Sequence, residues 1–76
     1  MDLRSLKYFV FVYEQQSFSA AAKLCFVAQP SISSSIAQLE QNLNTQLFIR
    51  RARGVKSSQA AERLYPLAKQ LLGQAD

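Results

Sequence analysis

The stretch VAQPSISSSIAQLEQ, residues 27–41, carries the periodicity that decides the fold. Its apolar residues repeat every three or four positions, which places them along one side of a helix. They are Ile32, Ile36, Leu39 and, just beyond the stretch, Leu43. Pro30 suits the first turn, where a missing N–H does no harm. The stretch also contains four serines and three glutamines, and within it no charged residue precedes Glu40. We therefore predict a helix over about residues 29–42 with a buried stripe and a neutral side of small hydrogen-bonding groups.

Two further helices are predicted before this one. Asp2 is a good N-cap for a first helix over about residues 3–15. The apolar residues of that helix recur at helical spacing: Leu6, Phe9, Val10 and Tyr13. A second helix can be capped by Ser19 and must stop before Pro30, because a new period begins just after that proline. We expect the buried face of the second helix to consist of Ala21, Leu24 and Cys25.

The residues after the third helix predict a short β-hairpin. The apolar run 47–49 is followed by RARGV, with Gly54 in the turn and Val55 at the start of the return strand. Three helices, the last two joined by a tight turn, and then a hairpin have the order of a winged helix-turn-helix. We therefore expect a mostly α fold. Residues 1–57 should form a winged helix-turn-helix, with a three-helix core and a short β-hairpin wing, and residues 58–76 a linker or dimerisation helix.

The last predicted helix begins after Ser58, which can cap it, and runs to residue 76. Pro66 should kink this helix, because proline removes a backbone donor and crowds the preceding turn. Its apolar face consists of Leu64, Leu67, Ala68 and Leu71. These side chains either pack back on the domain or pair with a second copy of the chain. We favour pairing, since Leu71 and Leu72 lie far beyond the last element that could cover them.

The positive charge of the chain is concentrated in the predicted hairpin. The chain has nine Lys and Arg against five Asp and Glu, a net charge of +4, and no acid lies between Glu40 and Glu62. Four of the basic residues fall within RRARGVK: Arg50, Arg51, Arg53 and Lys56. A localised basic patch is the expected footprint of a surface that binds a polyanion such as DNA. A solvated loop without a partner is the alternative reading of the same run.

The residue types that catalysis or metal binding needs are scarce. The chain has no histidine, one cysteine and two glycines, and its five acids are scattered. We therefore predict no catalytic residues, no metal site and no cofactor. Cys25 is expected to be a small buried hydrophobe. No apolar run approaches the roughly 18 residues of a membrane span, and the N-terminus does not resemble a signal peptide. We expect no membrane contact and a cytoplasmic, nucleoid-associated protein.

The neutral side of the third helix fits the requirements of a helix in the major groove. Serine and glutamine can hydrogen-bond base edges, and proline or alanine can contact a thymine methyl, whereas acidic side chains would repel phosphate. The candidates for base contact are Gln29, Pro30, Ser31, Ser33 and Ser34. The four basic residues of the hairpin would neutralise phosphates, and Arg53, beside Gly54, would enter a narrow A·T-rich minor groove.

Three other interpretations of these features remain open at this stage. Serine and glutamine can simply solvate the exposed side of a helix, although Glu, Lys and Arg are more usual there. A winged-helix module could bind only proteins through the apolar face of its last helix. Non-specific RNA or nucleoid binding would require exposed aromatic rings for base stacking. Against that reading, five aromatic residues mostly fall at core-facing positions: Phe9, Phe11, Tyr13, Phe18 and Phe48.

The chain also resembles the N-terminal DNA-binding domain of LysR-type transcriptional regulators over nearly its whole length. The segments that carry the resemblance are SFSAAAKL, QPSIS, IAQLEQNLNTQLFIR and RGV. It implies a bacterial regulator that binds an interrupted, partly palindromic operator in double-stranded DNA. The helix that begins at Gln29 would read the major groove, and Arg53, before the glycine of the wing, would enter the minor groove. The helix starting near Ser58 would pair in a homodimer, with a tetramer in the full-length protein. A small-molecule effector would bind only a C-terminal domain outside these residues.

Four positions depart from the pattern of that family. Ala28 stands where Ser or Thr often caps the recognition helix, a loss of about 1 kcal/mol. Ser34 occupies a position where arginine is frequent, which removes one expected contact to DNA. Ser57 replaces a usual apolar residue of the wing, and Ala61 replaces a usual glycine in the last helix. From these two changes we expect the wing to pack loosely.

Overall fold

A computed structural model describes residues 2–73, and within them the chain forms four helices and one antiparallel hairpin. The elements are α1 (Leu3–Gln15), α2 (Phe18–Cys25), α3 (Gln29–Leu43), β1 (Phe48–Arg50), β2 (Val55–Ser57) and α4 (Gln59–Leu71). The predicted winged helix-turn-helix with a following helix is therefore confirmed. The last three residues of the predicted final helix, 74–76, lie outside the described residues.

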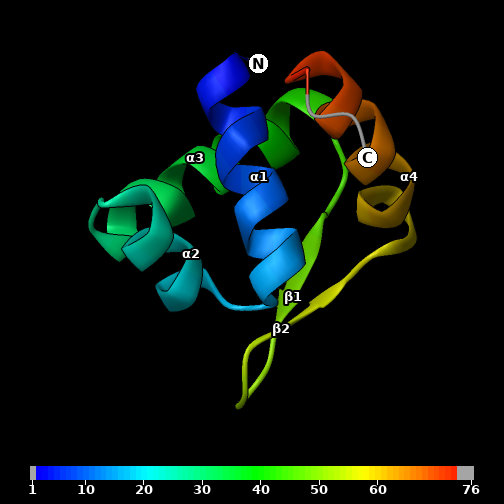
Figure 1. Cartoon of the computed structure of the whole chain (residues 1–76). Coiled ribbons are helices and arrows are strands. Elements are labelled where there is room, and N and C mark those ends of the chain that lie inside the picture. Colours follow the sequence, from blue (N-terminus) through cyan, green and yellow to red (C-terminus); the bar gives the residue numbers. More distant parts are fainter. Residues whose placement is uncertain (1, 74–76) are drawn as a thin grey trace.

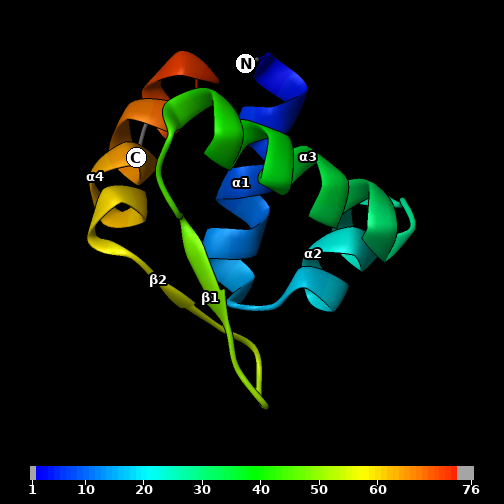
Figure 2. The same cartoon turned by 180° about the vertical axis from the view of Figure 1, so that it is seen from behind.

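Helix α1 lies between the other helices. The α2–α3 pair packs against it on one side and α4 on the other, while the hairpin projects from the bundle as a wing (Figure 1). The view from behind shows α3 lying across α1, with its outer side uncovered by any other element of residues 2–73 (Figure 2). The largest fully buried side chains come from α1, α3 and the residues leading into β1: Phe9, Val12, Ile32, Ile36, Leu39 and Leu47.

The second helix begins earlier than predicted. Ser17, rather than Ser19, is its N-cap, and the Ser17 Oγ accepts a hydrogen bond from the Ala20 N–H at 3.1 Å. The start at Phe18 also shifts the buried face, because Phe18 anchors a stripe that continues through Ala21 and Ala22. Of the predicted face, Ala21 is buried, the Leu24 side chain is 48% exposed and Cys25 is half-buried. The prediction of Leu24 as a core residue was wrong.

The second helix of the helix-turn-helix, α3, follows the sequence pattern closely. It starts at Gln29 with Pro30 in its first turn, and Ile32, Ile36 and Leu39 are buried along it. Leu43, the last of the predicted stripe, is half-buried against the core. Ala28, the residue before the helix, makes no side-chain capping hydrogen bond, as its methyl group requires.

The wing is anchored to the end of α1 instead of packing loosely. Gln16, the left-handed C-cap of α1, accepts a backbone hydrogen bond from the Val55 N–H at 3.2 Å. Its side-chain amide donates to Ser57 Oγ at 3.0 Å, so the serine that replaces an apolar residue holds the wing through a polar contact. Gly54 adopts φ +74°, and a Cβ at this position would lie 2.5 Å from the Gln16 carbonyl oxygen. Three wing residues therefore depend on Gln16, the residue that caps α1.

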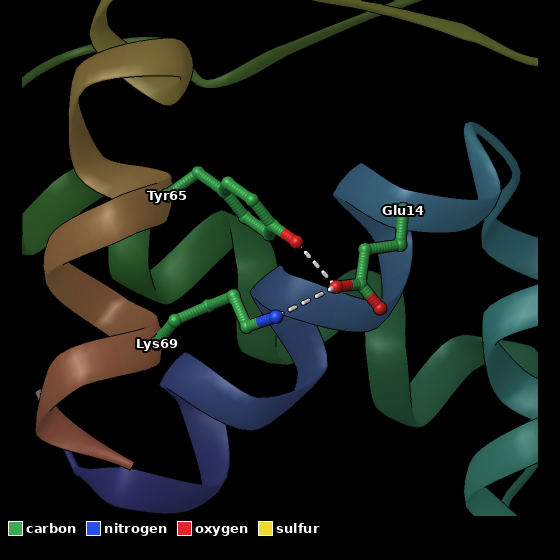
Figure 3. Close-up of polar contacts among 3 residues, drawn as sticks. All are labelled: Glu14, Tyr65 and Lys69. Atoms are coloured by element: carbon green, nitrogen blue, oxygen red, sulfur yellow. Dashed lines mark hydrogen bonds and ion pairs between the residues drawn. The ribbon is translucent and has the colours of Figure 1, made fainter. Parts of the chain in front are cut away.

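A polar and aromatic cluster attaches α4 to α1. Figure 3 shows Tyr65 and Lys69 of α4 pointing at Glu14 of α1. The Tyr65 hydroxyl donates a hydrogen bond to the Glu14 carboxylate, and Lys69 Nζ lies 3.8 Å from the same oxygen. The Tyr65 ring also stacks on Tyr13, with ring centroids 4.2 Å apart. The hydrogen bond to the Glu14 carboxylate raises the pKa of Tyr65, since ionised tyrosine would be an acceptor facing an acceptor.

The predicted apolar face of α4 divides into two parts. Ser58 caps the helix as predicted, accepting from the Ala61 N–H at 3.1 Å, and the helix continues through Pro66 to Leu71. Ala68 is fully buried and Leu64 half-buried, whereas Leu67 and Leu71 are 56% and 63% exposed. Leu72 packs against the core, so the expectation that nothing could cover it was wrong. Leu67 and Leu71 remain as an uncovered apolar strip.

Candidate nucleic-acid interface

The predicted base-reading residues lie together on the uncovered side of α3. The first two turns of the helix present Gln29, Pro30, Ser31 and Ser34 to solvent, and Ser33 is half-buried beside them. None of these side chains is charged. Helical geometry places Pro30 and Ser34 opposite to the buried isoleucines and Ser31 and Ser33 on the two flanks, while Gln29 is exposed at the first position of the helix. The surface is therefore a convex, neutral ridge of hydrogen-bonding groups, whose shape suits a groove about 12 Å wide.

Arg50, at the end of β1, connects the wing to this ridge. Its Nη2 donates a hydrogen bond to Ser33 Oγ at 2.7 Å. Its guanidinium carbon lies 4.0 Å from the centroid of the Phe18 ring, a cation–π geometry. Phe18 is buried and its ring meets Phe48 edge-on at 6.0 Å, so the platform under the guanidinium belongs to the core. One arginine thus contacts α2 and α3 from the wing.

The other three basic residues of the wing extend into solvent. Arg51, Arg53 and Lys56 are exposed, and within residues 2–73 their side chains make no hydrogen bond or ion pair. The tip is closed by a backbone hydrogen bond from the Arg51 N–H to the Gly54 carbonyl at 3.0 Å, which holds Arg53 in the turn. These cations are available to phosphate groups without first breaking a contact inside the protein.

A polar hollow lies between the wing and the helix-turn-helix. It is bounded by the starts of α2 and α3 and by both strands, and its walls include two serines, a glutamine and two arginines: Ser17, Ser19, Gln29, Arg50 and Arg51. Backbone N–H groups at a helix N-terminus and nearby arginines both favour a negatively charged group. The hollow has the composition of a seat for a backbone phosphate beside the recognition helix.

A second flank of the ridge was not found by sequence reasoning. The N-terminal part of α1 and the outer side of α3 enclose a groove that contains Arg4 and Tyr8 from α1 and Ser31, Ser34 and Gln38 from α3. Arg4 is exposed, so a cation stands near Ser34, the position where arginine was expected. No local pattern could have revealed this neighbour, because residues 4 and 34 line one groove only when α1 packs against α3.

Cys25 is the last residue of α2, and Phe26 follows it at the start of the turn to α3. Phe26 occupies the left-handed C-cap of α2 at φ 58° and is 94% exposed. Sequence reasoning assigned it no role. The five aromatic residues expected at core-facing positions are buried or half-buried, as predicted.

Cys25 is half-buried rather than buried, and loss of hydration raises the pKa of its thiol, which keeps it in the unreactive protonated form at neutral pH.

Neither a membrane-spanning helix nor a metal-binding cluster is present in residues 2–73. No helix there is long and apolar enough to span a bilayer. No group of three or more Cys, Asp or Glu side chains gathers where it could hold a metal ion.

The family model for bacterial regulatory helix-turn-helix proteins of the lysR family matches residues 3–62, which is most of the chain. The chain belongs to the LysR family. The matched residues include the whole helix-turn-helix, the wing and the start of α4.

Curated LysR-family relatives are similar over the full length of this chain. The nitrogen assimilation regulatory protein Nac of Escherichia coli is 42% identical over 76 residues, which are 100% of this chain and 25% of Nac. The transcriptional regulator BenM of Acinetobacter baylyi is 47% identical over 77 residues, which cover 100% of this chain and 25% of BenM. The chain thus spans about a quarter of the length of these regulators.

Solved LysR-family structures share the fold. The CbnR DNA-binding domain in a complex with DNA superposes with a TM-score of 0.94 at 36% identity, covering 96% of this chain and 84% of that one. The BenM DNA-binding domain bound to the catB site 1 DNA gives a TM-score of 0.91 at 44% identity, with 96% and 82% coverage. Both structures are complexes with DNA. Because each covers 96% of this chain, the similarity includes α4 as well as the winged helix-turn-helix.

Proposed function

We propose that this domain binds double-stranded DNA sequence-specifically and acts in bacterial transcription regulation. One observation carries the proposal: an uncovered, neutral, hydrogen-bonding face of α3 stands directly beside a wing of exposed cations. Base edges are read by such neutral groups, while phosphates supply most of the affinity through basic ones. The similarity to DNA-bound domains of CbnR and BenM supports the same conclusion.

In this proposal α3 lies in the major groove. Gln29, Pro30, Ser31, Ser33 and Ser34 face the bases, with Gln29 suited to a bidentate contact to adenine. Arg51 and Lys56 neutralise phosphates along the wing, and Arg53 at its tip enters an A·T-rich minor groove. Arg50 adds its charge between wing and helix, close to the phosphate that would occupy the hollow at the start of α2.

The exposed strip of α4 supports a dimer. Leu67 and Leu71 are 56% and 63% exposed on a helix whose other side is fixed to α1. Two copies pairing through Leu64, Leu67, Ala68 and Leu71 would present two recognition helices to two half-sites of an interrupted palindrome. Ala68 is fully buried and Leu64 half-buried within one copy, so the exposed pair Leu67 and Leu71 would make most of the contact.

The proposal extends to the protein that contains this domain. The curated relatives are about four times longer than this chain. From the resemblance to LysR-type regulators we propose that the full-length protein is a tetramer and that a small-molecule effector binds outside these residues. We further propose that it acts in the cytoplasm on the nucleoid, without enzymatic activity or cofactor of its own.

Selection from a random DNA pool tests the function directly. The domain should enrich a motif with two related half-sites, and binding to that motif should weaken with salt at a slope of log K against log salt near −3 per subunit. A shuffled duplex of the same length and composition is the control. A winged-helix module that binds only proteins would show no enrichment, no heparin retention and no salt-dependent gel shift, and that result would overturn the proposal.

A further inference from the structure

Arg50 differs in its contacts from the other basic residues of the wing. Its guanidinium touches Ser33 of α3 and the ring of Phe18 of α2, whereas Arg51, Arg53 and Lys56 make no side-chain hydrogen bond within residues 2–73. Attraction of a phosphate does not by itself require contacts of this kind, because it depends on charge. A lysine can also bind phosphate, as a point charge, and it would do so without these two contacts.

The contacts of Arg50 need the guanidinium group itself. The planar cation lies over the Phe18 ring at 4.0 Å while its edge donates to Ser33 Oγ at 2.7 Å. The compact ammonium of lysine has neither a flat face nor the fork of five N–H donors. Phe18 in turn is fixed by burial against Phe48 of β1, so the guanidinium is held between rigid elements.

The hydrogen bond also determines what Ser33 can offer to DNA. A serine hydroxyl has one hydrogen to donate and two lone pairs to accept with. Arg50 donates to one of these lone pairs, and its positive charge disfavours any other N–H donor that approaches the same oxygen. The hydroxyl hydrogen is left to point away from the guanidinium. Ser33 is therefore presented as a hydrogen-bond donor.

We propose that Arg50 is a positioning residue that sets the wing against the recognition helix and makes Ser33 select an acceptor in the major groove. The inference rests on the proposed function, because it assigns chemistry to the same interface. Acceptors on base edges are purine N7, guanine O6 and thymine O4, whereas the exposed polar group of cytosine is an amino donor. The base that Ser33 faces is therefore not cytosine.

The test compares two lysine substitutions that keep the charge. Arg50→Lys should weaken binding to the selected motif about 10-fold, since a hydrogen bond to a charged group and a ring contact are lost. Arg51→Lys, at the neighbouring position whose side chain makes no hydrogen bond or ion pair within residues 2–73, should change binding about 2-fold or less, because lysine binds phosphate as a point charge. The salt slope should be the same for both variants. Equal effects of the two substitutions would show that Arg50 acts only as a charge, and would overturn the proposal.

Base preference shows whether Arg50 acts through Ser33. Selection with Ser33→Ala should relax discrimination against cytosine at one position of each half-site, and selection with Arg50→Lys should relax the same position. The double variant should bind no worse than the weaker single variant by more than about 2-fold, because both changes remove one interaction. Relaxation at different positions, or fold-losses that multiply, would refute the coupling.

A measurement without DNA separates this inference from the proposed function. Because Arg50 lies over the Phe18 ring, its Nε–H proton should resonate upfield of those of Arg51 and Arg53 in the NMR spectrum of the free domain. Phe18→Leu should abolish the shift. If the domain binds no DNA but the shift is present, the proposed function fails while the contact stands. If the Arg50 proton coincides with those of the other wing arginines, the positioning role fails whatever the DNA result.

Discussion

Replacing Gly54 by alanine should destabilise the domain more than the backbone angle alone explains. Gly54 has φ +74°, where a residue with a Cβ costs about 1–2 kcal/mol. The added Cβ would also meet the Gln16 carbonyl oxygen at 2.5 Å, and that oxygen is the acceptor for the Val55 N–H. Relief of the clash must therefore weaken the hydrogen bond that docks the wing. We expect a total loss of about 2–4 kcal/mol in the free energy of unfolding.

Gly73 offers a matched control within the same chain. It has φ +73°, but nothing lies within 4 Å of the position that a Cβ would occupy. Gly73→Ala should thus cost only the backbone term of about 1–2 kcal/mol. Urea denaturation followed by circular dichroism measures both losses, and a domain of this size should melt about 4–8 °C lower for each kcal/mol. Equal losses for the two variants would refute the argument that Gly54 is required for close approach to Gln16.

Other predictions concern the contact between Tyr65 of α4 and Glu14 of α1, the DNA contacts and the dimer. Tyr65→Phe removes the donor to Glu14 but keeps the ring. The pKa of Tyr65 is raised in the folded state, so its stabilisation is present below the ordinary tyrosine pKa of 10.0 and is lost as pH rises through the folded value. Urea melts of the native domain should lose stability above that pH by a component that the variant lacks, and identical pH profiles would count against the hydrogen bond. Arg53→Ala should weaken gel-shift binding most for motifs with A·T-rich flanks. Gln29→Ala should instead relax preference at one base position by about 1–3 kcal/mol, and uniform losses on all sequences from both variants would contradict the assigned roles. Leu71→Lys should convert a dimer to a folded monomer in light scattering, and a native domain that is monomeric at high concentration would exclude pairing through α4.

Much of the site could be predicted because its residues are neighbours in sequence. A helix with Ile32, Ile36 and Leu39 buried must expose Ser31 and Ser34, whatever packs against it. The wing could be predicted from neighbouring residues in the same way, since Gly54 between two short extended runs specifies a tight turn. These parts of the fold depend on periodicity and turn chemistry, which a single sequence displays.

The errors came from positions where two local solutions compete. Both Ser17 and Ser19 could cap α2, and the sequence pattern does not rank them. Ser17 is the N-cap in the folded domain, because a helix that starts at Phe18 places the Phe18 ring in the core beside Phe48. The expected looseness of the wing failed for a related reason, since Ser57 lacks an apolar side chain but finds a donor on Gln16.

The sequence by itself determined the order of the elements, the buried stripe of α3, its neutral outer side and the cationic wing. The tertiary structure decided that Arg50 rests on Phe18 and Ser33, that Arg4 flanks Ser34, and that Glu14 receives Tyr65 from α4. The physical reason is that periodicity reports which side of an element is apolar. Contacts between residues far apart in the chain depend on how the elements cross, and that is set by packing of the whole core.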